Sequence, residues 1–577
     1  QLMGNTVSGN TGNGITLGLT SLDVNGLDLS GTSITSNTGN GLFVNLSDVD
    51  MSNVVANNVT SNDNDINGMK FLLRNTSSIV GGTFVGNSIQ RNGLDGVNVD
   101  LTDGTASTFG TAGNSIQFNN SVIAENGQAF AADGVRLRLY GGSSGDIQFN
   151  NTQIGNTVAP PTQSYGVDFI LGSGAFPGGT LVGSFTNSNV SGNAIDGILG
   201  VVNGTGAVGG SAATVTLAGT TVSANNNAGL DFAVNNAGSL GLIVSANSLI
   251  TNNGSDGIHT NATGTNTAVN TFLLGSTITN NGQVTPPGLG NGMTLNLDDN
   301  ARGNLTVTDM VIGNTAAGGT QQDGLNLNVN QTLIGSNTNL VANITTSTFA
   351  NNAVSGIAGN ITGNNVGLNP VNGLSMTMDQ VIVSGSGGNG VAFNVANGAL
   401  LQMSVDNSAI TTSGQNGMFI NAFDQYTLVA IDMADSALNN NGTLLFPGDG
   451  FNATISNGAT LNVCAETTIG SATPMSFSGN TGDGFDVNVS GVGSRADIDL
   501  HEVIAGADLV NGLLGNQLNG LKADVFDGGE LNVRANMTHF DGNFGAGLLG
   551  SVNDTNGADT VGRFRIIGGS ADNNQGD

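Results

Sequence analysis

The sequence is almost without several residue types on which enzymes and binding proteins depend. Its 577 residues include one cysteine, three histidines, three tyrosines and no tryptophan. A single cysteine excludes an internal disulfide, and three histidines leave little room for zinc sites or general-base catalysis. No apolar stretch approaches the roughly 20 residues of a membrane helix, and the sequence from Gln1 onward does not open with the pattern of a signal peptide.

Positive charge is scarce as well. Eleven Lys and Arg stand against 41 Asp and Glu, and the formal net charge is −30. Nucleic acids and anionic membranes are bound through clustered Lys and Arg, so we expect no nucleic-acid partner and no membrane insertion. The acidity favours solubility outside the cell and attracts divalent cations, so calcium is the cofactor it suggests, although none is required. Cys464, in an apolar run that begins at Leu461, is expected to be a small core residue.

What the chain has instead is one motif, Ser/Thr-x-apolar-x-x-Asn-x-x-Asp/Asn-Gly-apolar, which returns about eighteen times at spacings of 27 to 38 residues. Asx-Gly turns the chain sharply before a strand. Such regular self-similarity predicts a repeat architecture. The anchoring glycines are Gly14, Gly41, Gly68, Gly96, Gly134, Gly166, Gly197, Gly229, Gly257, Gly292, Gly324, Gly356, Gly390, Gly417, Gly450, Gly484, Gly520 and Gly547.

Between these turns, apolar and polar residues alternate, as in Leu325-Asn326-Leu327-Asn328-Val329. This period of two predicts strands with one buried face, and no stretch has a helical period. A unit of 27 residues accommodates three short strands and their turns. Extra residues gather at the turn before the glycine, where they would form outward loops. Five of the eight prolines lie there: Pro160, Pro161, Pro286, Pro287 and Pro447.

The repeat resembles that of right-handed parallel β-helix proteins, the fold shared with pectate lyases and many bacterial surface proteins. The resemblance covers essentially all 577 residues and implies an all-β solenoid of about 18 coils, three short strands in each. It implies little about function, because the same fold carries lyases, tailspikes, adhesins and passive stalks. A β-propeller or stacked sandwiches are the alternatives, but propeller blades usually need about 40 residues and aromatic signatures.

We expect residues 1–577 to form a single continuous solenoid and to be a segment of a longer array, since both ends lie within the repeat and lack a polar cap. Residues at one coil position stack along such a coil, and stacked Asn side chains bond to one another. The position four after the glycine predicts such a column at Asn45, Asn296, Asn328, Asn394, Asn421 and Asn488. Most phenylalanines, such as Phe71 and Phe169, are expected to point inward.

Catalytic candidates follow mainly from the resemblance. Pectate lyases bind calcium through clustered Asp and abstract a proton with Arg or Lys, and the nearest match here is Asp63, Asp65, Lys70 and Arg74. A polar turn followed by outward strand residues explains these four equally simply, and we favour that interpretation. The signatures of polygalacturonase-type hydrolases are absent, and His259 stands at an ordinary outward strand position.

Two further groups are weak candidates for binding a metal. Asp298 and Asp299 are the only adjacent Asp pair and end a strand. Asp497, Asp499, His501 and Glu502 alternate with apolar residues, so they could share one face and bind a metal. An exposed strand face accounts for them without a ligand. Calcium-binding nonapeptide repeats and EF-hand loops are absent, and threonine pairs that could suggest ice binding do not recur in register.

The sequence therefore predicts a structural, non-enzymatic, extracellular protein: an acidic solenoid segment of a cell-surface fibre, filament, stalk or adhesin. Its expected partners are copies of itself or adjoining coils end to end, and surface glycans. The alternative is a polysaccharide-binding or polysaccharide-cleaving, lyase-type β-helix.

Overall fold

The computed structural model describes residues 1–173, 175–176, 178–204, 210–283, 290–331, 337–364, 373–508, 512–555, 557 and 559–576. The chain divides into two compact units, Gln1–Gly290 and Asn291–Asp577. Within each unit, the described residues form β-strands and turns and no helix. The expectation of one continuous solenoid over residues 1–577 stays a prediction, and the two units are treated separately.

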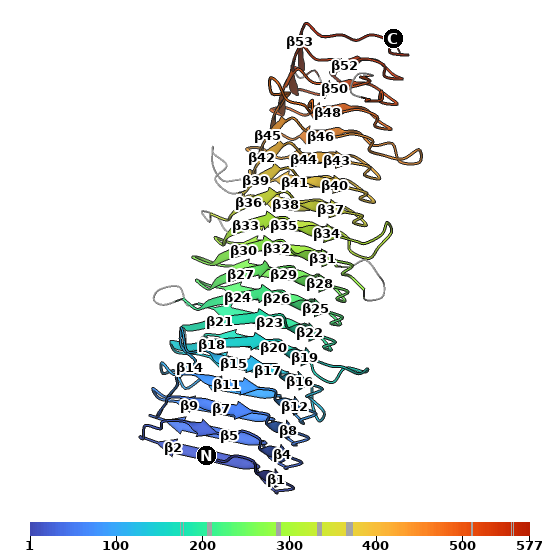
Figure 1. The fold of residues 1–577 in the computed structure, drawn as a ribbon. Coiled ribbons are helices and arrows are strands. Elements are labelled where there is room, and N and C mark those ends of the chain that lie inside the picture. The colour runs from blue at the N-terminus through green and yellow to red at the C-terminus, as the bar shows by residue number, and fades with distance from the viewer. Residues whose placement is uncertain are drawn as a thin grey trace. The chain divides into compact units, whose positions relative to one another are not determined.

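Each unit is a parallel β-solenoid, which confirms the expected fold class (Figure 1). The strand after each repeat glycine pairs in parallel with the equivalent strand one coil on, as Ile15 pairs with Leu42 in unit 1 and Met293 with Leu325 in unit 2. All 18 predicted glycines stand directly before a strand, nine in each unit. Successive coils thus form three sheets, which we call the first, second and third in chain order.

The first sheet has short strands. In unit 1 they are β1 (Thr6–Ser8), β4 (Ser33–Thr35), β8 (Thr60–Asn62), β12 (Ser88–Gln90), β16 (Val122–Ala124), β19 (Gln153–Gly155), β22 (Asn189–Ser191), β25 (Thr221–Ser223), β28 (Leu249–Thr251) and β31 (Thr277–Thr279). In unit 2 they are β34 (Val311–Gly313), β37 (Thr348–Ala350), β40 (Ile382–Ser384) and β43 (Ala409–Thr411). Beyond β43 this sheet continues as single parallel bridges, from Ala409–Ala437 to His539–Ser570.

The second sheet holds the strands that follow the repeat glycines. In unit 1 they are β2 (Ile15–Thr20), β5 (Leu42–Ser47), β9 (Met69–Arg74), β13 (Val97–Leu101), β17 (Val135–Leu139), β20 (Val167–Leu171), β23 (Ile198–Asn203), β26 (Leu230–Asn235) and β29 (Ile258–Thr263). In unit 2 they are β32 (Met293–Asp298), β35 (Leu325–Asn330), β38 (Ile357–Thr362), β41 (Val391–Ala396), β44 (Met418–Phe423), β46 (Phe451–Ser456), β48 (Phe485–Ser490), β50 (Leu521–Phe526) and β52 (Leu548–Asn553).

The third sheet has the longest strands, some of them divided. In unit 1 they are β3 (Leu27–Asp28), β6 (Asp50–Met51), β7 (Val54–Asn57), β10 (Ser78–Ile79), β11 (Gly82–Val85), β14 (Thr108–Phe109), β15 (Ile116–Asn119), β18 (Ser143–Asn150), β21 (Gly179–Thr186), β24 (Ala212–Ala218), β27 (Ser239–Ser245) and β30 (Ala268–Leu274). In unit 2 they are β33 (Arg302–Thr308), β36 (Asn339–Thr345), β39 (Gly373–Asp379), β42 (Leu400–Asp406), β45 (Leu428–Ala434), β47 (Thr460–Glu466), β49 (Arg495–His501), β51 (Glu530–Asn536) and β53 (Val561–Ile567).

The core of each unit lies inside its coils, because alternate strand residues point inward and are buried. Phenylalanines stack there from coil to coil: ring centroids are 4.6 Å apart between Phe84 and Phe118, and 5.4 Å between Phe118 and Phe149. Phe71 and Phe169, predicted to point inward, are buried. Offset stacking of this kind adds about 1 kcal/mol per pair beyond the burial of apolar area.

A second set of buried residues joins the coils at the turn that precedes the repeat glycine. In unit 2, the Oδ1 atom of Asn480 accepts hydrogen bonds from the backbone N–H and the side-chain amide of Asn441, at 3.0 and 3.1 Å. Asn480 in turn donates from its backbone N–H and from its side-chain amide to the Oδ1 atom of Asn516, at 3.1 Å each. Every member donates to the next, so a buried amide that would otherwise be costly is satisfied.

We call these residues the buried asparagine column. In unit 1 it runs through Asn10, Asn37, Asn64, Asn92 and Asn126, continues by way of Gln163, and resumes through Asn193, Asn225 and Asn253 to Asn281. In unit 2 it comprises Asn441, Asn480, Asn516 and Asn543.

The column predicted four residues after the glycine forms only in part, and it lies on the solvent side. Asn296, Asn328, Asn360, Asn394 and Asn421 are linked in series by side-chain hydrogen bonds. Asn45 instead lies between Gly18 and Leu72, and Asn488 lies between Thr454 and Asp524. The prediction is therefore wrong for these two residues, because their neighbours one coil away carry no amide.

The inserts before the glycines form exposed loops, as expected. Phe130 and Val158 are 74% and 64% exposed, and Leu444 and Leu445 are 85% exposed. The predicted loop prolines Pro160, Pro161 and Pro447 lie in these segments. Pro286 and Pro287 lie outside the described residues.

Candidate functional site

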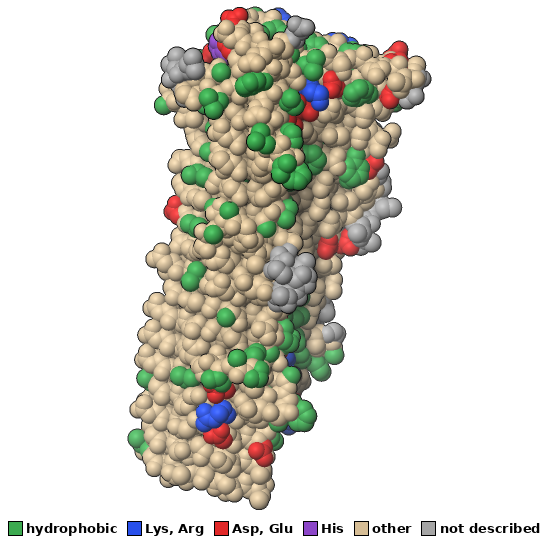
Figure 2. Space-filling view, turned by 90° about the vertical axis from the view of Figure 1, so that its right-hand side faces the viewer, with side chains coloured by type: hydrophobic (Ala, Val, Ile, Leu, Met, Phe, Trp, Pro, Cys, Tyr) green, Lys and Arg blue, Asp and Glu red, His purple; other side chains and the backbone are tan. Residues whose placement is uncertain are grey.

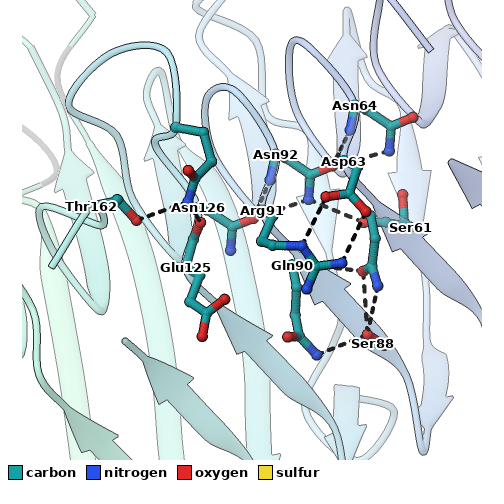
Figure 3. A network of polar contacts seen from close by, with 12 residues as sticks. Ser61, Asp63, Asn64, Ser88, Gln90, Arg91, Asn92, Glu125, Asn126 and Thr162 are labelled. Carbon is teal, nitrogen blue, oxygen red and sulfur yellow. Dashed lines mark hydrogen bonds and ion pairs between the residues drawn. The ribbon is translucent and has the colours of Figure 1, made fainter. Parts of the chain in front are cut away.

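The candidate lyase residues do not assemble as the resemblance implies. Asp63 stands at a coil corner with a φ of 57°, and Arg91 occupies the same corner one coil on. The Arg91 guanidinium donates to both Asp63 carboxylate oxygens, at 2.8 and 2.9 Å (Figure 3). This contact raises the pKa of Arg91. Asp63 is thus engaged by Arg91, which sequence reasoning missed although the two residues are one coil apart.

Asp63, Asp65 and Arg91 line an open pocket of about 510 Å³ together with the loop residues Gln128 and Ala129. Lys70 and Arg74 lie on β9 and do not line it. The pocket therefore offers one cation beside two carboxylates, with no lysine in reach of them.

Asp298 and Asp299 form a tight turn between β32 and β33. Asp299 and Asn300 both have a positive φ, 46° and 73°, which reverses the chain before Arg302 begins the next strand. Burial raises the pKa of Asp298, and a hydrogen bond from Asn330 partly offsets that effect. These contacts are those of a turn, and among the described residues the two carboxylates belong to no group of three acidic, histidine or cysteine side chains that could hold a metal ion.

Asp497, Asp499 and His501 share the outward face of β49, as predicted, while Ala496, Ile498 and Leu500 are buried. Glu502 follows the strand with a φ of 53°. Arg495 donates to Asp497 through two nitrogens, at 2.6 and 3.1 Å, so this carboxylate is already paired on its own strand.

The neighbouring strands bring further charges to this face. Asp499 stands in register with Arg534 of β51, which stands in register with Arg565 of β53. On the other side, Cys464 of β47 lies beside Asp499, and Asp432 of β45 lies beside Cys464. These residues line an open groove of about 460 Å³, together with Asn462, Asp497, Asn532 and Arg563. We call it the Arg–Asp groove.

Cys464 is not a core residue, contrary to the sequence-based expectation. The inward positions of β47 are taken by Leu461, Val463 and Ala465, so the intervening Cys464 points outward and is half-buried. Its thiol pKa is raised by burial and by Glu466 and nearby aspartates, which keeps the thiol protonated at neutral pH. The apolar run concealed this strand alternation.

Buried carboxyls gather on the second sheet of unit 1. Burial, together with Asp95 and Asp168, raises the pKa of Asp133 to about 8. The Arg138 guanidinium pairs with Asp168, whose other oxygen has no hydrogen-bond partner among the described residues. Burial also raises the pKa of Asp196 to about 6, against a hydrogen bond from the backbone of Ala228. Asp133 and Asp196, each in an Asp-Gly turn of the repeat, therefore hold their protons at higher pH than an ordinary carboxyl.

Unit 2 repeats this pattern. Burial raises the pKa of Asp449 to about 6 and raises those of Asp483 and Asp486. Lys522 forms ion pairs on this face: its Nζ atom lies 3.1 Å from Asp486 and 3.6 Å from Asp524. Among the described residues of either unit, no three His, Cys, Asp or Glu side chains form a group that could hold a metal ion.

His259, expected at an ordinary outward position of β29, has an acidic partner there. Its Nδ1 atom lies 2.8 Å from Asp231 of the neighbouring strand β26. This hydrogen bond raises the pKa of His259. The pair links two coils, and no further histidine lies on the strand.

On the face shown in Figure 2, charged side chains lie in small groups of mixed sign, and most of the surface is neutral. A scan against protein-family models and a search of curated proteins each found no match. No helix in the described ranges is long and apolar enough to cross a membrane.

Proposed function

We propose that the chain is a structural protein of the cell exterior: an acidic β-solenoid segment of a surface fibre, stalk or adhesin. The observation that supports this best is the buried asparagine column, which joins successive coils from Asn10 to Asn281 in unit 1, by way of Gln163, and from Asn441 to Asn543 in unit 2. A site for chemistry has to be built once. A contact that is repeated from coil to coil stabilises an extended solenoid.

The amino-acid composition supports the proposed location outside the cell. The net charge of −30 favours solubility and disfavours polyanionic partners such as nucleic acids and anionic membranes. The same proposal includes calcium ions bound between acidic corners. It also includes end-to-end association with copies or adjoining coils, because the last strands of a parallel coil can pair with the strands of the coil that follows.

Immunogold electron microscopy of native cells tests this function, with an antibody against the exposed loop around Leu444 and Leu445. We expect gold on fibrous material outside the cell, and loss of that material when the gene is deleted. A parallel sample treated with a calcium chelator reports whether ions hold the material together. Gold confined to the cytoplasm would contradict the proposal.

A polysaccharide-binding or lyase-type surface is the second candidate, and the pocket beside Arg91 is the observation that favours it. Incubating the full chain with acidic glycans and measuring chain length tests this candidate. Depolymerisation by the parent protein that is lost in Arg91→Ala would establish it. Unchanged chain length with every glycan would remove the lyase-type function, and absence of glycan binding in the same samples would remove the binding function as well.

A further inference from the structure

The Arg–Asp groove lies where the charge balance of the chain changes abruptly. No Lys or Arg occurs between Arg302 and Arg495. The described strands β49, β51 and β53 then bring Arg495, Arg534, Arg563 and Arg565 to one face of the third sheet. In a chain with 11 cations in all, this is a marked concentration of positive charge.

The charges in the groove are divided by sign. Its three acids, Asp432, Asp497 and Asp499, come from β45 and β49, and its three arginines come from β51 and β53. The groove is therefore neutral as a whole but dipolar, with an acidic half and a basic half. A ligand of one sign would be attracted to one half and repelled by the other.

The two ends of the groove carry the charges that the protein leaves without an ion pair. Asp497 is paired with Arg495, Arg563 with Glu530, and Arg534 lies 3.7 Å from Asp499. For Asp432 at one end and Arg565 at the other, we find no hydrogen bond or ion pair to any described residue. Side chains at both ends are thus available to a ligand.

Asp432 and Arg565 stand in one column, four strand spacings apart. At about 4.8 Å per spacing, they are separated by about 19 Å along the sheet. An extended polypeptide advances about 3.3 Å per residue, so about six residues span this distance. The amide side chain of Asn462 also lines the groove and can bond to a peptide backbone, whereas Asn532 is engaged by Asp497, Glu530 and Arg563.

We propose that the Arg–Asp groove binds an extended, dipolar peptide segment, with a basic side chain on Asp432 and an acidic side chain about six residues away on Arg565. Chains that carry both an ammonium or guanidinium and a carboxylate at this spacing are peptides, whereas acidic glycans and nucleic acids carry anions alone. This binding activity goes beyond the proposed structural function and does not depend on it.

Fluorescence anisotropy with the full chain and end-capped, labelled peptides tests the proposal. The probe carries Lys and Asp at its two ends, separated by five Gly and Ser residues. The comparison peptides carry Lys at both ends, Asp at both ends, or Lys and Asp separated by one residue. We expect the long dipolar probe to bind at least tenfold more tightly than the other three, with an affinity that falls as salt rises.

Arg565→Gln and Asp432→Asn should each weaken binding of the probe about tenfold. Both side chains are on the surface of the sheet, so neither change disturbs the core. Arg302→Gln is the matched control, because Arg302 is an exposed arginine of the same sheet outside the groove, and it should leave binding unchanged. Absence of binding at millimolar peptide would overturn the proposal. So would tighter binding of the two-Asp peptide or of an oligouronate, which would make the groove a site for polyanions.

Discussion

Replacing Asn480 by alanine tests how much the buried asparagine column stabilises unit 2. Asn480 is fully buried, and its side chain makes four hydrogen bonds: two accepted from Asn441 and one donated to each of Leu438 and Asn516. A buried hydrogen bond contributes about 1 kcal/mol net, and a donor left without a partner costs about 1–3 kcal/mol. We therefore expect Asn480→Ala to lower the free energy of unfolding of unit 2 by about 4 kcal/mol.

Asn394 provides the matched control. It is an asparagine of the same unit in the outer column, where it donates to Asn360 and accepts from Asn421, but its side chain is exposed. Water replaces those contacts, so Asn394→Ala should cost less than about 0.5 kcal/mol. Comparing the two variants separates the stability that comes from burial of the amides from the stability that any asparagine ladder provides.

The assay is urea unfolding of the full chain, combined with hydrogen exchange. Exchange of the Asn441 backbone N–H is the local readout, because that group donates to Asn480. It should exchange much faster in Asn480→Ala and at the parent rate in Asn394→Ala. A loss below about 1 kcal/mol for Asn480→Ala, or equal losses for both variants, would refute the role given to the buried column.

Three further predictions concern unit 1. Asp133→Asn should stabilise the protein at pH 8 by about 1–3 kcal/mol. The folded state keeps the Asp133 proton up to about pH 8, whereas the unfolded chain loses it near the ordinary pKa of 3.8. The stability of the parent protein therefore falls as pH rises through this window. Equal urea midpoints for both proteins at pH 8 would contradict this prediction. Arg138→Met should cost about 3–5 kcal/mol, because it leaves the buried Asp168 carboxylate without its cation, and Arg138→Met/Asp168→Leu should recover most of the loss in thermal unfolding. Gly200→Ala should cost about 1–3 kcal/mol, since a Cβ there would lie 2.3 Å from the buried Phe169 ring; a melting temperature at the parent value would show that the core gives way easily.

Much of the fold was predictable from local rules. The repeat glycines marked the start of every strand of the second sheet, and the alternation of apolar residues identified the buried faces. The contacts between coils were harder, because they depend on which residues come into register after inserts of different length. Arg91 lies 28 residues beyond Asp63, and the partner of Asp499 lies 35 residues further along, at Arg534.

The buried carboxyls could not be recognised from sequence either. Asp133 and Asp196 each precede a repeat glycine, where an Asp-Gly turn explains the aspartate without burial. Burial is the main cause of their raised pKa values, and Asp95 in the adjacent coil adds to it for Asp133. The prediction for Cys464 was wrong for the opposite reason. An apolar run suggested that its side chain is buried, whereas the alternation along the strand places it on the outside.

Single-molecule force spectroscopy of the full chain tests the proposed structural role most directly. If the coils are fastened one to the next, pulling from the two ends should give a series of force peaks, each releasing one coil of 27 to 38 residues. At about 3.4 Å per residue, each step adds about 9 to 13 nm of chain. Asn480→Ala should lower the peaks from its own coils and leave the others unchanged. Smooth extension without peaks would mean that the coils are not held together against force, and it would contradict the proposed structural role.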